Sequence, residues 1–573
     1  MQRLTLTLLT CFLVYGIQAQ NLEIVGKEKP FKMNGGISVN QVGYLSNDTI
    51  SQRDPYTYYL NGNLNFNIYG WSVPFTFSYT NQKLNYTQPF NQYSLHPTYK
   101  WIRMHLGYTS MSFSPYTLNG HLFLGGGIEC APEAPFTISA MYGRLRRAVE
   151  FDSLAINPSP PEFERWGYGM NGTYTLSPVE AIKATIGFTV FHASDKPGSL
   201  EYLLDSMAFP GENLVISTNL EMTVAGGFSF TGEIASSAVT QNTESVFTDE
   251  QNVKWSRFMG TLIGSNATTE YFSAKRLNFG YTADFYSVGV GYERIDPGYN
   301  TYGAYYFQND MENITVNGSL MLFENKLSLG ANVGKQRDNL DDSKASEMKR
   351  WITAFNAGYN SGEKLSLNIS YSTFTSFMNI RSQFDYINQI TPYDNLDTLD
   401  YTQLSATTSA NVSYILKNTD DRRQNLNFNL SYQKASDLQG DTEVEGGSRF
   451  YNMSIAYGHS IVPLSLTITG ALNANINRSP GMESSTFGPT VAINKMMLDK
   501  KLRNSLSCSF NQAQANGNVQ SRVLSFRLSS SYRLGKHHNF NLGLTNMNRK
   551  TNIQEDPRSI SELVATLGYS YVF

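Results

Sequence analysis

Cysteine is nearly absent from this chain, with three residues in 573. Cys11 lies in an apolar N-terminal segment, whereas Cys130 and Cys508 lie on apolar faces. The sequence has no CxxC pair and no Cys/His spacing typical of a metal site. This scarcity excludes a disulfide-rich scaffold, and we expect Cys130 and Cys508 to be small surface residues without disulfide partners.

Charge and long apolar runs are also scarce. Charged residues make up 16% of the chain, the net charge is -3 and the mean hydropathy is -0.32. Beyond the N-terminal segment, no apolar run approaches the roughly 18 residues that a membrane-spanning helix requires. These features exclude a helical membrane protein, and the lack of a clustered basic face argues against a nucleic-acid-binding protein.

Motifs of the common enzyme classes are missing. The sequence has no GxSxG, no HExxH, no Walker loop and no GxGxxG between a strand and a helix. The adjacent acidic pairs Asp341-Asp342 and Asp420-Asp421 are the remaining candidates, and the second falls in a predicted turn. We therefore predict that the protein is not an enzyme and holds no cofactor.

Potential metal ligands do not follow a known spacing. His96, His105 and His121 are separated by nine and sixteen residues, which matches no zinc motif. Acidic loops could bind calcium, but they lack the EF-hand spacing with its glycine, so we expect solvated acidic surfaces and no metal site. The loop acids are Asp394, Asp397, Asp400, Asp437, Asp441, Glu443 and Glu445.

Aromatic residues, by contrast, are abundant at 13% of the chain. The N-terminus, "MQRLTLTLLTCFLVYGIQAQ", has one cation, an apolar stretch from Leu4 to Tyr15 and small residues before Ala19. This pattern predicts a secretory signal peptide over residues 1–19 and fits a lipoprotein signal at Cys11 poorly.

Alternation of apolar and polar residues is the strongest pattern. In "LSFRLSSSYRL", Leu524, Phe526 and Leu528 share one face, whereas Arg527 and Arg533 lie on the other. Many such segments run for nine to twelve residues, about the length that crosses a bilayer when a strand is tilted. We predict an all-β, antiparallel up-and-down transmembrane barrel of about 22 strands, within a range of 18–26.

The predicted connections alternate between short and long. "ENK", "NSGEK" and "SIVP" join successive strands, whereas the intervening links, such as "KQRDNLDDSKASEMKR", are longer and polar. Short turns on the periplasmic side and long loops outside are typical of outer-membrane barrels.

The predicted barrel covers residues 56–573. Residues 20–55 are an N-terminal tail, a plug or an added strand, and these alternatives stay open. The final strand, "ELVATLGYSYVF", is expected to pair with the first, so that its apolar face meets lipid. It resembles the outer-membrane sorting signal through Leu567, Tyr569, Tyr571 and Phe573, which implies the barrel-assembly machinery as a partner during biogenesis.

A longer segment carries a second resemblance. Residues 88–129, "QPFNQYSLHPTYKWIRMHLGYTSMSFSPYTLNGHLFLGGGIE", resemble the N-terminal region of large outer-membrane barrels of Bacteroidota. This likeness implies the fold and an outer-membrane location, and it implies no activity or catalytic residue.

Projection of the strands places a set of charged residues inside the barrel. They could select solutes by charge in an open channel, or they could pair with one another or with an inserted loop and fill the lumen. The candidates are Arg103, His105, Glu129, Lys183, Glu221, Glu233, Arg527 and Arg533.

The first hypothesis is therefore a porin-like channel for small solutes in the outer membrane. The alternative is a non-conducting barrel that acts as a scaffold or accessory subunit of an export, assembly or surface-binding complex. A TonB-dependent transporter is disfavoured, because little chain precedes the first predicted strand. Outer-membrane lipid is the expected surrounding, and no nucleic-acid partner is expected.

Overall fold

The fold was analysed in a computed structural model of the 573-residue chain. The structure describes residues 31–48, 53–81, 91–151, 160–179, 181–201, 208–224, 226–246, 259–260, 262–264, 266–344, 349–373, 406–435, 438–439, 442–443, 447–551 and 558–573. The predicted signal peptide and most of the acidic residues proposed for calcium lie outside these ranges.

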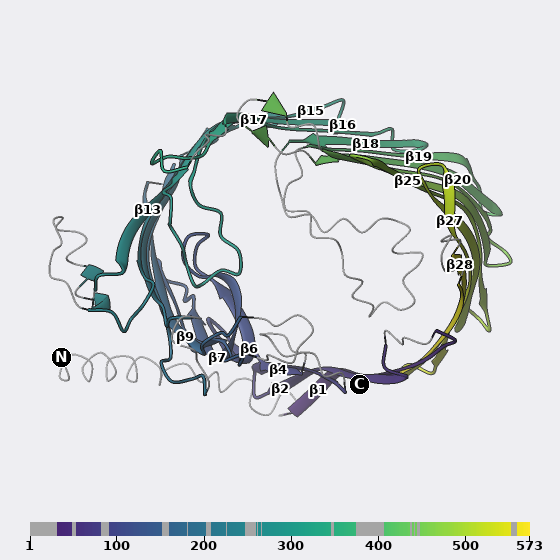
Figure 1. Ribbon diagram of the computed structural model, residues 1–573, viewed down its shortest axis with the longest axis horizontal. Coiled ribbons are helices and arrows are strands. Elements are labelled where there is room, and N and C mark those ends of the chain that lie inside the picture. The colour runs from purple at the N-terminus through teal and green to yellow at the C-terminus, as the bar shows by residue number, and fades with distance from the viewer. Residues whose placement is uncertain are drawn as a thin grey trace.

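One closed antiparallel barrel contains almost all of the described strands (Figure 1). Its sheet has 27 strands, of which β4 (Gln92–Leu95) and β5 (Thr98–Tyr99) both lie between β3 and β6. These two share one position in the ring, which leaves 27 - 1 = 26 positions. The predicted fold class is confirmed, and the strand number lies at the upper end of the predicted range.

The remaining strands follow chain order around the ring. The first half contains β1 (Phe31–Ser46), β2 (Tyr56–Ile68), β3 (Trp71–Thr80), β6 (Ile102–Ser112), β7 (Asn119–Cys130), β8 (Phe136–Arg146), β9 (Arg165–Val179), β10 (Ile182–Asp195), β11 (Glu212–Val224), β12 (Phe228–Thr240), β13 (Thr269–Thr282), β14 (Tyr286–Ile295) and β15 (Met311–Leu322). The second half contains β16 (Leu327–Arg337), β17 (Lys349–Asn360), β18 (Leu365–Ser372), β19 (Ala406–Asn418), β20 (Arg422–Ala435), β23 (Ser448–Ile461), β24 (Leu466–Ser479), β25 (Met482–Met497), β26 (Leu502–Ala515), β27 (Asn518–Leu534), β28 (His538–Thr551) and β29 (Ser559–Val572). A separate hairpin is formed by β21 (Leu438–Gln439) and β22 (Thr442–Glu443).

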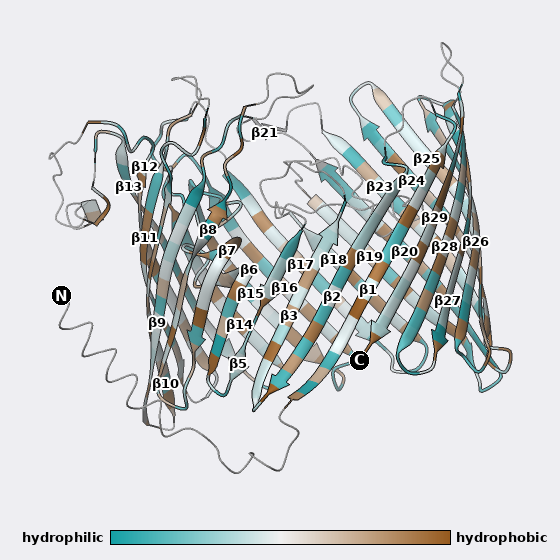
Figure 2. Cartoon of the chain, turned by 90° about the horizontal axis from the view of Figure 1, so that it is seen from below, coloured by the Kyte–Doolittle hydropathy of each residue, from teal (hydrophilic) through white to brown (hydrophobic). Residues whose placement is uncertain are grey.

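The strand alternation sets the two faces of the wall (Figure 2). Large apolar side chains that are exposed, such as Phe188, Phe279 and Leu506, mark the outer face. Their sequence neighbours point inward, because successive side chains in a strand alternate between faces. Closure pairs every strand edge, which satisfies the backbone hydrogen bonds that lipid cannot satisfy.

Connection lengths separate the two rims of the barrel, which we call the short-turn rim and the long-loop rim (Figure 2). The predicted turns after residues 322, 360 and 461 are confirmed, and Asp420-Asp421 lies in the short turn between β19 and β20. The alternation is not uniform, because β24–β25 and β26–β27 are joined at the long-loop rim by two residues each, Pro480-Gly481 and Asn516-Gly517. Asn516 and Gly517 have φ angles of 48° and 80°, which suit a tight hairpin.

The N-terminal boundary of the barrel lies earlier than the sequence analysis placed it. Residues 31–46 form β1, which pairs with β2 on one side and with β29 on the other. Of the three alternatives for residues 20–55, a strand is therefore observed between Phe31 and Ser46, and the barrel includes these residues as well as the predicted residues 56–573. The glycine-rich sequence of this strand obscured its place in the wall.

A small apolar cluster lies on the outer face near the long-loop rim. Met259 and Ile263, from the link between β12 and β13, pack against Leu214, Ile216 and Ala238. Among the described residues, no helix has the length and apolar character needed to cross a membrane.

Candidate functional site

The lumen is the concave region of interest, and its two sides differ. Inward-facing residues of β6–β15 form two buried apolar clusters, which we call the inner core. Residues from the β6–β7 loop complete it, since Tyr116 and Leu118 are fully buried there. The inner core consists of Met111, Leu118, Phe123, Met141, Leu145, Phe191, Ala193, Tyr116, Val215, Ala235, Ala274, Ile295 and Tyr299.

The β14–β15 loop, residues 296–310, covers the inner core from the lumen side (Figure 1). Tyr299 donates a hydrogen bond from its hydroxyl to the Tyr116 carbonyl oxygen at 2.9 Å, and the Thr301 hydroxyl donates to the Thr117 carbonyl oxygen at 2.7 Å. The Asn119 N–H donates to the Gly303 carbonyl oxygen at 2.8 Å. This loop therefore connects the β14–β15 side of the ring to β6 and β7 through the interior.

The same loop is fixed to the strands between these two places. The Asn213 side chain of β11 donates from Nδ2 to the Asn300 carbonyl oxygen at 3.3 Å and accepts at Oδ1 from the Tyr302 N–H at 3.0 Å. The Ser237 hydroxyl of β12 also donates to the Asn300 carbonyl oxygen, at 2.6 Å. Because Asn213 and Ser237 are fully buried, each of these bonds fixes the loop in a protected environment.

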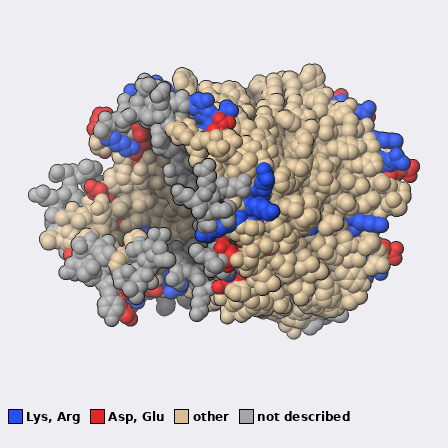
Figure 3. All heavy atoms as spheres, turned by 45° about the vertical axis from the view of Figure 1, so that its right-hand side comes forward, with Lys and Arg blue, Asp and Glu red and all other residues tan. Residues whose placement is uncertain are grey.

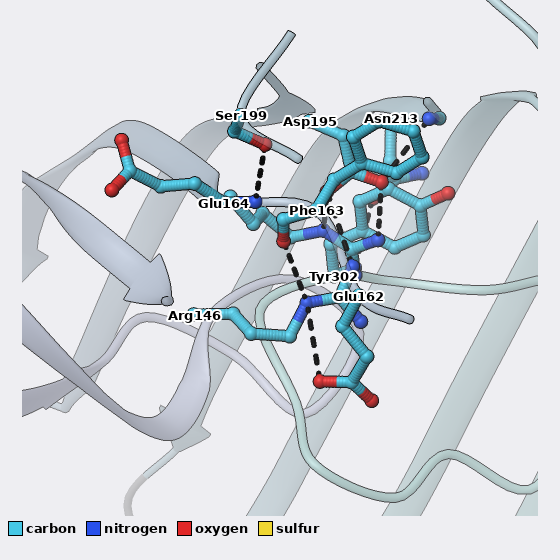
Figure 4. A network of polar contacts seen from close by, with 10 residues as sticks. Arg146, Glu162, Phe163, Glu164, Asp195, Ser199, Asn213 and Tyr302 are labelled. Carbon is cyan, nitrogen blue, oxygen red and sulfur yellow. Dashed lines mark hydrogen bonds and ion pairs between the residues drawn. The ribbon is translucent and has the colours of Figure 1, made fainter. Parts of the chain in front are cut away.

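Paired charges lie at one end of the inner core (Figure 4). Arg165 makes a bidentate contact with Asp195, with Nε–Oδ1 and Nη2–Oδ2 distances of 2.8 and 2.9 Å. Arg146 reaches the same carboxylate at 3.3 Å and Glu162 at 3.8 Å. The Arg165 guanidinium lies 3.5 Å from the ring centroid of Tyr302, so the loop tyrosine covers the ion pair.

A second charged group joins the loops to the middle of the wall. Arg276 of β13 contacts Glu293 Oε1 of β14 at 3.1 Å through Nε, and the Tyr116 hydroxyl donates to the same oxygen at 2.5 Å. Glu233, a predicted lumen residue, lies opposite Arg276 in the strand register. Its Oε1 atom is buried without a hydrogen-bond partner among the described residues.

The buried loop tyrosines stay protonated at neutral pH. Burial, followed by the charge of Glu233, raises the pKa of Tyr299 well above its usual value. Burial also raises the pKa of Tyr302, and its effect exceeds the lowering by the Arg165 charge. Both hydroxyl groups therefore remain neutral, which for Tyr299 is the form that donates to the Tyr116 carbonyl oxygen.

Three predicted lumen residues lie together beside the inner core. Arg103 and Glu129 face each other in the register of β6 and β7, and their side chains are 3.4 Å apart. His105 Nε2 lies 3.3 Å from Glu129 Oε1, and His105 Nδ1 lies 3.0 Å from His96 Nδ1. The described residues contain no group of three or more His, Cys, Asp or Glu side chains that could hold a metal ion.

The other predicted lumen residues do not join this group. Lys183 and Glu221 lie on the neighbouring strands β10 and β11 and are exposed. Arg527 and Arg533 lie on β27, where they face Thr545 and Asn539 of β28. All eight candidates fall on the inward face by strand parity, but they occupy separate places around the ring.

The wall from β18 to β29 has a different inner face. Its buried inward residues are mainly amides and hydroxyls, with Met547 and Val564 as the apolar exceptions among the described residues. The polar members are Gln433, Ser454, Asn473, Ser509, Asn511, Ser525 and Thr545. One row crosses five strands in register, from Asn368 through Asn411, Asn429 and Ser454 to Asn473. This surface offers hydrogen-bond donors and acceptors, and its inward charges include Arg527 and Arg533.

A polar pocket of about 390 Å³ lies on the inner wall between these two sides. Arg276 and Glu293 form one side of it, and Asn278, Asn313 and Asn332 add amide groups. Asn313 is 6% exposed, and its Oδ1 atom has no hydrogen-bond partner among the described residues. The pocket therefore presents an unused acceptor beside an ion pair.

The C-terminal residues lie on the outer face of β29. Leu567, Tyr569 and Phe573 are exposed, and Tyr571 shares their parity.

Cys130 and Cys508 are both free, as predicted.

Sequence analysis missed the residues that fix the loops. Arg146, Arg165 and Asp195 lie at strand ends, and Arg276 and Glu293 lie mid-strand. Strand parity alone could have placed Arg276 and Glu293 on the inner face. No local pattern could have paired Tyr116 with Glu293, because 177 positions separate them.

Comparisons with known proteins give information about the fold of the chain only. No protein-family model and no curated protein matches the chain. Solved structures that resemble it include the P pilus usher (PapC) translocation pore, at 12% identity over 94% of this chain and 99% of that chain, with a TM-score of 0.39. The outer membrane transporter YddB from Escherichia coli is 8% identical over 94% and 80% of the two chains, with a TM-score of 0.38.

A third structure is OccAB4 from Acinetobacter baumannii, which is 9% identical over 68% of this chain and 98% of that chain, with a TM-score of 0.27. TM-scores below 0.5 support no inference about activity. The strand topology itself gives the chain the fold of a large outer-membrane β-barrel.

Proposed function

We propose that the protein is a porin-like channel that passes small polar solutes along the β18–β29 side of the lumen. The observation that carries this proposal is the inner face of these strands, where amide and hydroxyl side chains replace an apolar core. Such a surface stays hydrated, and it can exchange hydrogen bonds with a passing solute at little cost.

We assign the ion selectivity of the proposed channel to the arginines on the β18–β29 side of the lumen. Arg527 lies mid-strand on β27, and Arg533 lies near the short-turn rim on the same strand. Two cations on one inner surface raise the local concentration of anions, since a cleft with low-dielectric walls focuses the field.

Single-channel conductance in a planar bilayer tests the proposal. The wild-type protein is expected to give a steady conductance, and Arg527→Glu with Arg533→Glu is expected to shift its ion preference from anions toward cations. Arg522→Glu with Lys550→Glu is the matched control, because these two residues lie on β27 and β28 with outward parity. No conductance from a correctly folded barrel would contradict the channel.

The inner core favours one alternative function. A packed interior with a loop fixed across it is what a non-conducting scaffold or accessory subunit would need, since it keeps the barrel rigid without an aqueous path. If conductance is absent, pull-down of outer-membrane proteins with the folded barrel becomes the test. A stable, stoichiometric partner would then support the scaffold.

We also propose that the barrel resides in the outer membrane, is exported by the signal peptide at residues 1–19 and is of the Bacteroidota type. The barrel-assembly machinery would recognise β29 through Leu567, Tyr569, Tyr571 and Phe573. Tyr571→Ser with Phe573→Ser is expected to lower the yield of membrane-assembled barrel. Normal assembly of this double variant would contradict the sorting signal.

A further inference from the structure

Charged side chains form a row on the outer face at the long-loop rim. Five neighbouring strands, β13–β17, each place one charged residue at the same level of the register. In order they are Lys275, Arg294, Glu312, Arg337 and Lys349. We call this set the outer row, and its four cations and one anion leave a net charge of 4 - 1 = +3.

Strand parity places the outer row outside the barrel. On β13, Lys275 shares the face of the exposed Leu277 and Phe279. On β15, Glu312 shares the face of the exposed Ile314 and Val316. Lys349 shares the face of Trp351, whose exposed fraction of 67% is among the largest in the wall.

The single acid of the row holds two of its neighbours in place. Glu312 Oε2 lies 2.5 Å from Arg337 Nε, and Glu312 Oε1 lies 3.7 Å from Arg294 Nη1. The Tyr292 hydroxyl also donates to Glu312 Oε1, at 2.9 Å. Arg294 Nε also lies 3.5 Å from Asp296 Oδ1, so two carboxylates face the two guanidinium groups, and Lys275 and Lys349 give the arrangement its net positive charge.

A second row repeats the pattern farther around the ring. Lys434, Arg449 and Arg478 follow one another across β20, β23 and β24, and Glu483 of β25 ends the row. Arg522 and Lys550 face each other on β27 and β28 at the same rim. The recurrence on strands far from the first row argues that the cations are a property of this rim.

The next level toward the middle of the wall is aromatic and apolar. It contains Tyr292, Ile314 and Trp351 beside the outer row, with Lys335 between the last two, and Tyr432 and Tyr451 beside the second row. Residues two apart on a strand differ by about 7 Å along it. The cations therefore lie just beyond an aromatic girdle, at the depth of lipid headgroups.

On the side of the barrel that includes β20, β27 and β28, charged side chains lie mostly toward the margins of the wall, and a broad uncharged area lies between them (Figure 3). The short-turn rim carries charges of both signs. Its turns combine acids and bases, as in Glu324 with Lys326 and Glu363 with Lys364.

We propose that the outer row binds the phosphate groups of anionic lipid headgroups in the leaflet at the long-loop rim. Lysine and arginine side chains extend from the apolar wall to the interface, where each is attracted to lipid phosphate. Arginine adds a planar pair of donors that matches a phosphate. The site does not depend on conduction, so it stands or falls separately from the channel.

Lipid binding to the purified, folded barrel tests the proposal. Native mass spectrometry would measure the fraction of protein that carries diphosphorylated lipid A, with phosphatidylcholine as the uncharged comparison. For Lys275→Gln, Arg294→Gln and Lys349→Gln combined, we expect lipid A binding to fall by at least about tenfold, with no change for phosphatidylcholine.

The matched control removes three cations from the short-turn rim, as Lys326→Gln, Lys364→Gln and Lys500→Gln. It is expected to bind lipid A like the wild type. Equal binding by the outer-row variant, or an equal loss in the control, would overturn the proposal. Displacement of lipid A by millimolar inorganic phosphate would assign the row to free phosphate instead.

A second variant keeps the proposal testable if the triple variant fails to fold. Glu312→Gln removes the only acid of the outer row and is expected to increase lipid A binding. A purely structural role for the row predicts the opposite, because Arg294 and Arg337 would lose their partner. A decrease in lipid A binding would therefore contradict the proposal.

Discussion

The inner faces of β6–β15 and β18–β29 differ, although their outer faces follow one pattern. Both present alternating apolar residues to the outside. Inside, β6–β15 contribute a packed core with paired charges and fixed loops, whereas β18–β29 contribute amides and hydroxyls. The outer alternation is therefore what makes a strand part of the barrel, and the inner residues are free to specialise.

This freedom has a physical basis. A lipid-facing position must be apolar, because an unpaired polar group in hydrocarbon is costly. An inward position only has to be satisfied, by water, by a partner charge or by packing. Inner residues therefore carry the differences on which function depends.

The largest expected effect comes from breaking the buried ion pair of the first region. Asp195→Ala leaves Arg146 and Arg165 without their shared carboxylate, and the side chain of Asp195 is only 4% exposed. We expect the free energy of unfolding to fall by about 3–5 kcal/mol. Urea unfolding of the barrel in lipid vesicles measures it.

Glu483→Ala is the control for this prediction in the second region. Glu483 pairs with Arg478 at 3.3 Å, but both side chains are 54% exposed. The expected loss is at most about 1 kcal/mol, as for other exposed ion pairs. Because Glu483 lies on the outer face of β25, similar losses for both variants would show that burial in the inner core does not strengthen an ion pair.

A cavity in the inner core should give the second-largest decrease in the free energy of unfolding. Leu118→Ala removes a fully buried side chain of the β6–β7 loop, and the expected cost is about 2–5 kcal/mol in the same unfolding measurement. Leu506→Ala, on the lipid-facing side of β26, leaves no internal cavity and should cost less. The comparison fails if Leu506→Ala is the more damaging change.

Substitution of a closely packed glycine should give a smaller loss of stability. A Cβ atom at Gly125 of β7 would overlap the backbone carbonyl oxygen of Tyr142, whereas one at Gly470 of β24 would meet no heavy atom within 4 Å. Gly125→Ala is expected to destabilise the barrel by about 1–3 kcal/mol. Gly470→Ala is expected to be neutral or slightly stabilising, and a loss there would contradict the difference in packing.

The smallest effect is a response to acid near the β16–β17 loop. Burial alone would raise the pKa of Asp310, but hydrogen bonds from the Leu340 N–H, Lys344 and the Asn339 N–H lower it overall. A lowered carboxyl pKa stabilises the fold above the unfolded value of about 3.9, and the contribution is lost as the pH falls toward the folded value. Protection of the Asn339 and Leu340 amides from hydrogen exchange should therefore decrease below about pH 4.

Asp310→Asn is the control for the acid response. It removes the titrating group, so protection of the two amides should no longer depend on pH after correction for intrinsic exchange. The short β26–β27 turn serves as the internal reference, because the hydrogen bonds of Asn516 to the described residues join backbone and amide groups. A pH response that persists in Asp310→Asn would assign it to another group.

Most of the fold could be predicted from alternation, because the lipid-facing period of two is imposed on every strand. The inward parity of Arg103, Glu233 and Arg527 followed from that period. A strand at residues 31–46 was one of three alternatives that the sequence left open, since glycine and asparagine weaken its apolar face. Its pairing with β29 depends on residues more than 500 positions away.

The interior could be predicted only in part. The contact between Arg103 and Glu129 joins adjacent strands, so the register brings these residues together. The bonds from Tyr299 and Thr301 to the β6–β7 loop span 183 and 184 positions, and no periodicity encodes them. Which of the inward charges are paired is a consequence of loop placement, and it requires the structure.

The loop at residues 296–310 also has a mechanical consequence. It joins β14 and β15 to β6 and β7 from the inside, and so forms a cross-link inside the barrel between strands that are not neighbours. A section of the wall that is cross-linked in this way resists bending. Among the described residues, β18–β29 have no equivalent cross-link. Under lateral pressure from the bilayer, the arc from β6 to β15 should therefore keep its curvature.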